Sequence, residues 1–106
     1  MKYESTITLT KEELDKFLLL QGMSGSESYN MYGLCRNESL IKTVTFPNGN
    51  FVDIKLNIGD EDEPNWTEAV LFNKEGQQIA YTEPEDTFTG EWYLTSDMDE
   101  YVVTVK

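Results

Sequence analysis

The chain has 106 residues and a formal net charge of −12, with 20 acidic residues, eight basic residues and no histidine. This length fits one core, so we expect residues 1–106 to fold as a single domain. The absence of histidine removes the commonest proton-transfer group and metal ligand near neutral pH. The negative charge also disfavours direct binding to nucleic acid, because no basic stripe offsets phosphate repulsion.

The first expected elements are a strand and a helix. Residues 3–9 alternate around β-branched positions, which predicts a strand. Thr10-Lys11-Glu12-Glu13 is a capping box and predicts a helix over residues 11–21 that ends near Gly22. Leu19 falls on the side of this helix away from its apolar face. It is either covered by the next segment or exposed as a contact for a partner.

The segment 22–38 is rich in Gly and Ser, and we expect it to be irregular or partly mobile. A structureless loop of this length is uncommon in a compact domain. The segment also contains Tyr29 and other large apolar residues that linkers usually lack. Besides plain disorder, two interpretations stay open: a short helix near 28–34, or a loop that folds against a partner.

From residue 39 onward the sequence predicts one strand after another. The expected strands cover 40–46, 51–58, 66–72, 77–82, 91–95 and 101–105. Together with the first strand they make about seven strands and one N-terminal helix. Tight turns between short strands favour antiparallel pairing. We therefore expect an α+β, mainly β fold, built as an antiparallel sandwich or a strongly curved sheet.

Phe51 stands out in the second of these strands. Val52, Ile54 and Leu56 alternate toward one side, as in a strand with one buried face. Phe51 lies on the opposite, polar side. It is either covered by the helix or the 22–38 segment, or exposed for binding.

The negative charge is concentrated in one half of the chain. Residues 57–105 hold thirteen carboxylates and one cation, whereas residues 1–56 hold seven carboxylates and six cations. Such asymmetry steers cationic partners, and we expect one anionic side that docks on a basic protein surface, as found in nucleic-acid-binding proteins. The candidate contacts are Asp60, Glu61, Asp62, Glu63, Glu83, Glu85, Asp86, Asp97, Asp99 and Glu100, with Leu19, Phe51 and Tyr29 as apolar anchors.

Other functions are compatible with parts of the sequence. The run Asp60 to Glu63 could be a solvated face, or it could hold Ca²⁺, although the EF-hand spacing is absent. Acids near Trp66 and Trp92 could act on or bind a sugar, but a domain this small leaves little room for a deep cleft. We therefore expect no enzymatic activity, cofactor or metal. A structural or oligomeric module and a carbohydrate-binding domain remain the alternatives.

The sequence also indicates a compartment. Cys35 is the only cysteine, so no internal disulfide can form, and an unpaired thiol suits a reducing environment. The N-terminal residues do not resemble a signal peptide, and no apolar run is long enough to span a membrane. We expect a cytoplasmic protein. Its oligomeric state is left open.

Several segments resemble small acidic proteins of Gram-positive phages and conjugative elements. The similar segments are Phe51-Val52-Asp53-Ile54-Lys55, Glu68-Ala69-Val70-Leu71-Phe72 followed by Gly76, Gly90-Glu91-Trp92 and Tyr101-Val102-Val103-Thr104-Val105. The resemblance runs from about residue 44 to the end and transfers no site residues. It implies a mobile-element context, in which small acidic proteins include anti-CRISPR and anti-restriction inhibitors. The expected function is therefore a non-enzymatic inhibitor that blocks a nucleic-acid-binding surface of a partner protein.

Overall fold

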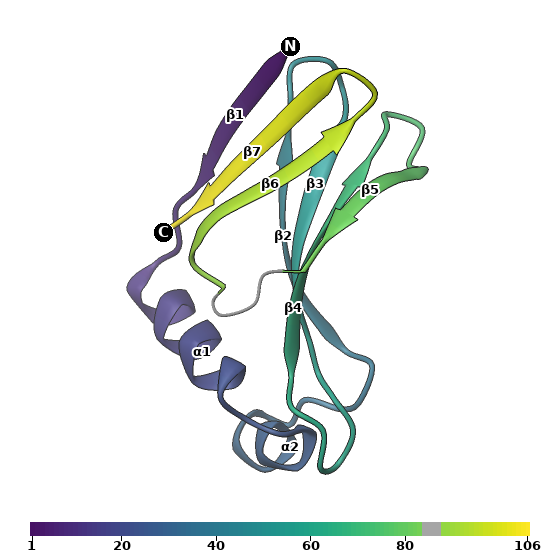
Figure 1. Cartoon of the computed structure of the whole chain (residues 1–106). Coiled ribbons are helices and arrows are strands. Elements are labelled where there is room, and N and C mark those ends of the chain that lie inside the picture. Colours follow the sequence, from purple (N-terminus) through teal and green to yellow (C-terminus); the bar gives the residue numbers. More distant parts are fainter. Residues whose placement is uncertain (84–87) are drawn as a thin grey trace.

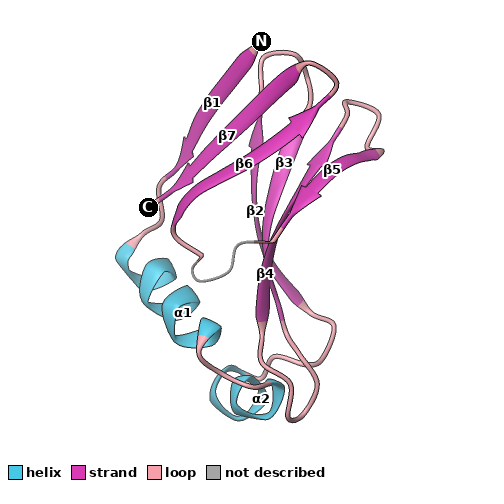
Figure 2. Ribbon diagram, in the orientation of Figure 1, coloured by secondary structure: helices cyan, strands magenta, loops and turns pink. Residues whose placement is uncertain are grey.

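The computed structural model describes residues 1–83 and 88–106. This part of the chain forms seven strands in two sheets and two helices (Figures 1 and 2). In chain order the elements are β1 (Lys2–Ile7), α1 (Lys11–Gln21), α2 (Gly25–Tyr32), β2 (Ser39–Thr45), β3 (Phe51–Asn57), β4 (Trp66–Phe72), β5 (Gln78–Thr82), β6 (Gly90–Ser96) and β7 (Asp99–Val105). The fold is therefore α+β and mainly β. The expected strands all form, with ends that shift by one or two residues.

The two sheets differ in how their strands are paired. The four-stranded sheet has the order β2-β3-β4-β5 and is antiparallel throughout. The three-stranded sheet has the order β1-β7-β6, in which β6 and β7 form an antiparallel hairpin. β1 pairs with β7 in parallel, so the expectation of purely antiparallel pairing is wrong for this strand. Parallel strands need a long crossover connection, and here the connection is most of the chain.

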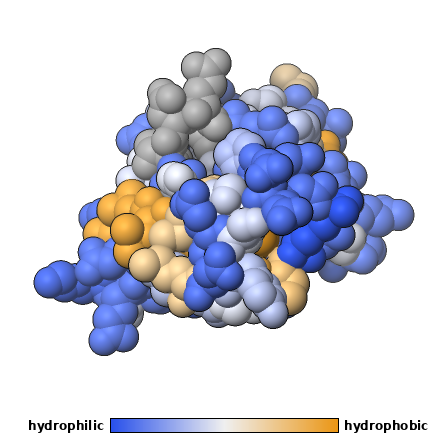
Figure 3. All heavy atoms as spheres, turned by 90° about the horizontal axis from the view of Figure 1, so that it is seen from below, coloured by the Kyte–Doolittle hydropathy of each residue, from blue (hydrophilic) through white to orange (hydrophobic). Residues whose placement is uncertain are grey.

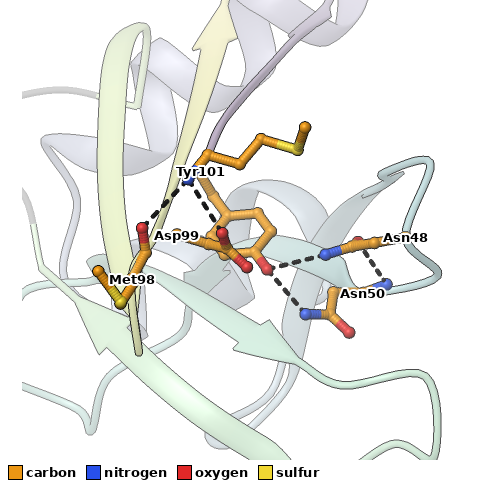
Figure 4. Close-up of polar contacts among 6 residues, drawn as sticks. Asn48, Asn50, Met98, Asp99 and Tyr101 are labelled. Carbon is orange, nitrogen blue, oxygen red and sulfur yellow. Dashed lines mark hydrogen bonds and ion pairs between the residues drawn. The ribbon is translucent and has the colours of Figure 1, made fainter.

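One hydrophobic core takes side chains from both sheets and from α1. In β3 the alternation expected from the sequence is confirmed from Phe51 to Leu56, because Val52, Ile54 and Leu56 are fully buried while the residues that alternate with them are partly exposed. Tyr101 of β7 is buried with them, and its hydroxyl oxygen accepts hydrogen bonds from the side-chain amides of Asn48 (3.0 Å) and Asn50 (2.8 Å) (Figure 4). The β2–β3 turn is thereby attached to the other sheet.

The first helix begins and ends as the sequence predicts. The side chain of Thr10 accepts a hydrogen bond from the backbone of Glu13, whose carboxylate accepts one from the backbone of Thr10. Phe17 on the buried side of α1 stacks on Phe88, with ring centroids 4.2 Å apart. Glu13 also forms an ion pair with Lys42 of β2. These contacts hold α1 beside the four-stranded sheet, below the three-stranded sheet in Figure 1.

A second helix forms inside the segment expected to be irregular. Of the interpretations left open for residues 22–38, the short helix is confirmed, although it begins at Gly25 rather than near 28. Ser24 caps its N-terminus by accepting from the backbone N–H of Glu27. Gly33 ends it with a φ of 70°, a left-handed conformation that glycine adopts without a steric penalty. α2 lies at the lower end of the molecule in Figure 1.

Candidate functional site

The run of four acids between β3 and β4, residues 60–63, lies against the first turn of α2, and we call it the acidic loop. The backbone N–H of Gly25 donates to two carbonyl oxygens of this loop, those of Asp60 and Glu63, both at 3.1 Å. A helix N-terminus leaves such N–H groups without intrahelical partners, so the loop satisfies them. The loop backbone is therefore fixed on α2, while the side chains of residues 61–63 are exposed.

Two glycines allow this close approach. A Cβ atom on Gly25 would lie 2.2 Å from the carbonyl oxygens of both Gly59 and Asp60. A Cβ atom on Gly59 would lie 2.7 Å from the carbonyl oxygen of Glu63. No backbone can tolerate such contacts without moving. Gly25 stands in the Gly- and Ser-rich segment that was expected to be irregular, and nothing in its local pattern indicates that it packs against a loop far along the chain.

A buried asparagine joins the acidic loop to both helices. The side chain of Asn65 is 7% exposed, and its Oδ1 accepts from the backbone N–H of Gly59 at 3.0 Å. Its Nδ2 donates to the carbonyl oxygen of Leu20 at 2.9 Å and to Oγ of Ser28 at 2.6 Å. All the hydrogen-bonding groups of this amide thus have partners, which is the condition for burying one at low cost. Nothing in the residues around Asn65 indicates this role.

The charges of the acidic loop are mostly unpaired. The carboxylate of Asp60 lies 2.6 Å from Nε of Arg36. Within the described part of the chain, no ion pair involves Glu61, Asp62 or Glu63. Acids near a helix N-terminus are stabilised by the helix dipole, typically by about 0.3–1 kcal/mol each. The loop therefore has a structural role at α2, and its fixed backbone also presents three exposed carboxylates.

A pocket of about 460 Å³ opens beside the acidic loop, and we call it the α2 pocket. It is lined by Gly25, Ser26, Tyr29, Asn30, Leu34, Cys35, Arg36, Gly59 and Glu61. The side chain of Tyr29 is 59% exposed, so its ring is open to a ligand. The guanidinium of Arg36 is held by Asp60, which leaves Glu61 as the charge without an ion-pair partner among these lining residues.

Leu19 and Tyr29, two of the expected anchors, lie on the helices at this end. Leu19 is 50% exposed, so the segment after α1 does not cover it. Lys16, one turn earlier on the same face of α1, lies over the ring of Tyr32 in α2, 5.3 Å from its centroid. This end of the molecule is seen from below in Figure 3. Its surface is mostly hydrophilic, with an apolar patch on the side where α1 lies.

Phe51, the third expected anchor, lies away from the helices on the four-stranded sheet. It is partly buried and stacks on Phe72 of the neighbouring strand, with ring centroids 5.0 Å apart. Its cover therefore comes from its own sheet rather than from a helix or residues 22–38. Phe51 thus has a packing role, and its exposed fraction is lower than those of Leu19 and Tyr29.

The remaining acids do not join the acidic loop. Asp97, Asp99 and Glu100 lie at the β6–β7 turn, at the opposite end of a molecule that is 43 Å long (Figure 1). There the amino group of Met1 lies 3.2 Å from the carboxylate of Asp99 (Figure 4). Asp97 adopts a φ of 55°, so the extended spacing expected for Asp97 and Asp99 is not formed. The single anionic side expected from the sequence is replaced by two separate acidic ends.

Glu83 directly follows β5 and is exposed, whereas Glu85 and Asp86 fall outside the described residues. The hydroxyl of Tyr81 hydrogen bonds to Glu83, and this bond together with the charge of the carboxylate raises the pKa of Tyr81. On β6 the hydroxyl of Tyr93 donates to Glu91, with the same effect on the pKa of Tyr93. A raised pKa keeps both hydroxyl groups protonated near pH 7.

The geometry gives little support to the alternatives to protein binding, which are sugar binding and metal binding. Trp92 is 3% exposed and its indole N–H donates to the carbonyl oxygen of Phe88 at 3.2 Å, so this ring cannot stack on a sugar. Trp66 is 40% exposed. Across residues 1–83 and 88–106, no three acidic or cysteine side chains gather as a metal-binding group. Within the same residues, no helix combines the length and the apolar character needed to cross a membrane.

Comparison with known protein families, with curated protein sequences and with solved structures finds no match for this chain.

Proposed function

We propose that this chain is a non-enzymatic binding protein whose acidic loop docks on a cationic surface of a partner protein. The observation that carries the proposal is the fixed loop backbone, with its hydrogen bonds from Gly25 to Asp60 and Glu63. A surface that is already ordered loses little conformational entropy when it binds. Three exposed carboxylates on such a backbone suit recognition better than three carboxylates on a mobile tail would.

Apolar contacts beside the loop supply the rest of the interface. Complementary charge mainly accelerates association and selects the partner, whereas buried aromatic and aliphatic side chains provide most of the affinity. Tyr29 and Leu19 are exposed by 59% and 50% at the same end of the molecule as the acidic loop. Their exposure supports a mixed interface, with a carboxylate region next to apolar anchors.

The partner in this proposal is a nucleic-acid-binding protein, and the docked chain competes with nucleic acid for its basic surface. The resemblance to small acidic proteins of mobile elements favours an inhibitor of host defence, such as an anti-CRISPR or anti-restriction protein. The cytoplasm is the compartment in which such partners act. The exposed, unpaired thiol of Cys35 fits a reducing environment.

The experiment compares three charge reversals in the full chain. Asp62→Lys changes the acidic loop at a residue whose side chain is exposed and without an ion pair among the described residues. Glu75→Lys makes the same change of charge in the exposed β4–β5 turn, and Glu100→Lys makes it at the other acidic end. Each protein is immobilised to capture partners from host cell lysate, at low salt and at 0.5 M salt (about a 4 Å screening length).

The proposal requires three results together. First, the captured protein binds nucleic acid. Second, the higher salt concentration or excess duplex DNA releases it from the immobilised chain. Third, Asp62→Lys captures much less of it than Glu75→Lys does. A loss with Glu100→Lys would show that the second acidic end also takes part. If capture is the same for Asp62→Lys as for the unchanged chain, or if DNA does not compete, the electrostatic docking is wrong.

A second function, an oligomeric module, is favoured by one observation. The outer face of the four-stranded sheet exposes Ile41 by 48%, Ile79 by 38% and Tyr81 by 54%. Apolar side chains on one sheet face can be covered by a second copy of the chain. Native mass spectrometry at micromolar concentration distinguishes the two functions: a stable dimer with no captured partner supports this alternative, and a monomer contradicts it.

A further inference from the structure

We infer that the α2 pocket receives a single arginine side chain of the partner. This inference rests on the proposed function, because it names the group through which a basic protein would recognise this end of the molecule. At about 460 Å³ the pocket falls within the range of sites that bind small molecules or side chains. It is formed by α2, the segment after α2 and the loop that follows β3, so its walls come from parts of the chain that are fixed to one another.

The lining offers the two groups that a guanidinium uses best. Guanidinium groups stack on aromatic rings, and the ring of Tyr29 lines the pocket and is largely exposed. They also bind carboxylates through two parallel hydrogen bonds. Glu61 lines the same pocket and has no ion-pair partner among the described residues. In one pocket, an aromatic ring can stack on the planar face of a guanidinium while a free carboxylate binds its N–H edge.

An anion is a poor ligand for the same pocket. Arg36, the cation of the lining, is partly neutralised because its Nε lies 2.6 Å from the carboxylate of Asp60. The first backbone N–H groups of α2 are also used, because Gly25 and Ser26 donate to carbonyl oxygens of the acidic loop. Any anion would further be repelled by the exposed carboxylates of that loop. These features favour a cationic ligand over an anionic one.

Cys35 provides a reporter without any change to the protein. It is the only cysteine in the sequence, it is exposed, and it lines the α2 pocket. A ligand in the pocket covers its thiol and slows its reaction with iodoacetamide. The rate of alkylation therefore measures occupancy, and amide chemical shifts of Ser26 and Asn30 provide an independent measurement on the same pocket.

The probes are three capped pentapeptides that differ only at the central residue: Ac-Gly-Gly-Arg-Gly-Gly-NH₂ and its lysine and glutamine versions. We expect the arginine peptide to slow alkylation of Cys35 and to shift the pocket amides, with weaker effects from lysine and none from glutamine. Tyr29→Ala and Glu61→Gln should each weaken the arginine peptide about fivefold, as expected for one cation–π contact or one charged hydrogen bond.

Matched variants control for general effects of the substitutions. Tyr81→Ala removes a tyrosine of similar exposure from the four-stranded sheet, and Glu75→Gln removes an exposed carboxylate from the β4–β5 turn. Both should bind the arginine peptide as the unchanged chain does. Circular dichroism verifies that all four variants are folded, which is expected because the replaced side chains are exposed.

The result separates this inference from the proposed function. Equal protection by the arginine and glutamine peptides, or unchanged binding by Tyr29→Ala and Glu61→Gln, overturns the pocket assignment. Equal binding of lysine and arginine shows attraction by charge alone and overturns the choice of arginine. If partner capture still depends on Asp62 while the peptides fail, the docking function stands without the pocket. If the pocket binds arginine but Asp62→Lys leaves capture intact, the pocket stands and the docking function fails.

Discussion

Replacing Asn65 by alanine should destabilise the end of the molecule that carries the acidic loop. The substitution removes three hydrogen bonds from a side chain that is 7% exposed. The N–H of Gly59 loses its partner, and an orphaned buried donor costs about 1–3 kcal/mol. The carbonyl oxygen of Leu20 keeps the N–H of Met23, and Oγ of Ser28 still donates to its own helix, so these two losses cost about 1 kcal/mol each. We expect a total of about 3–5 kcal/mol.

Asn73 provides a control with the same chemistry in a different environment. Its side chain also makes three hydrogen bonds, accepting from the backbone of Glu75 and Gln77 and donating to the side chain of Gln77. These bonds lie in an exposed turn, where water replaces them after substitution. We therefore expect Asn73→Ala to cost only about 1 kcal/mol. The two variants differ in burial rather than in the number of bonds lost.

Urea unfolding followed by tryptophan fluorescence measures both costs. With a slope of about 1.5 kcal/mol per molar urea, a loss of about 3 kcal/mol lowers the midpoint by about 2 M. The corresponding change for Asn73→Ala is below about 1 M. Equal midpoints for Asn65→Ala and Asn73→Ala would refute the reasoning, because they would show that the buried amide does not hold the acidic loop and the helices together.

Two further outcomes test the same local structures. Gly25→Ala places a Cβ atom 2.2 Å from backbone oxygens and should lower the thermal midpoint by several degrees, whereas Gly22→Ala, whose nearest neighbour would be 3.8 Å away, should leave it unchanged or raise it. Equal effects would contradict the packing of α2 on the loop. The pKa of Glu13 is lowered mainly by its hydrogen bond from Lys42 and next by that from Thr10. The contact with Lys42 therefore stabilises the fold at pH values above the usual pKa of a glutamate, and this stabilisation is lost as the pH falls through the lowered pKa. Lys42→Met should therefore raise the pKa of Glu13 in an NMR titration; an unchanged pKa would contradict the ion pair.

Local patterns were sufficient to predict most of the elements. The alternation around Val52 and Ile54 identified the buried face of β3, and the capping box at Thr10 located the start of α1. Such signals lie within a few residues of one another, so one sequence contains them in full. The parallel pairing of β1 with β7 has no comparable signal, because it joins residues about a hundred positions apart and depends on how the whole chain packs.

The candidate site was predicted only in part, for the same reason. The acidic loop, Leu19 and Tyr29 were named from the sequence and lie at one end of the molecule. Asn65 and Gly25 were missed, since their importance comes from partners that are distant in the chain. Both are ordinary residues in their local context: one stands between a proline and a tryptophan, and the other stands among serines.

The division of the charge between two ends follows from the topology. In antiparallel sheets successive turns lie at alternate ends, so acids on turns are separated even when they are close in sequence. The β3–β4 loop and the β6–β7 turn are at opposite ends of a 43 Å axis, whereas charges are screened over about 8 Å at physiological ionic strength. The two groups therefore act as independent fields, and the net charge of −12 does not describe what a partner meets. A basic surface docked at the acidic loop should be insensitive to Glu100→Lys unless it is long enough to reach both ends.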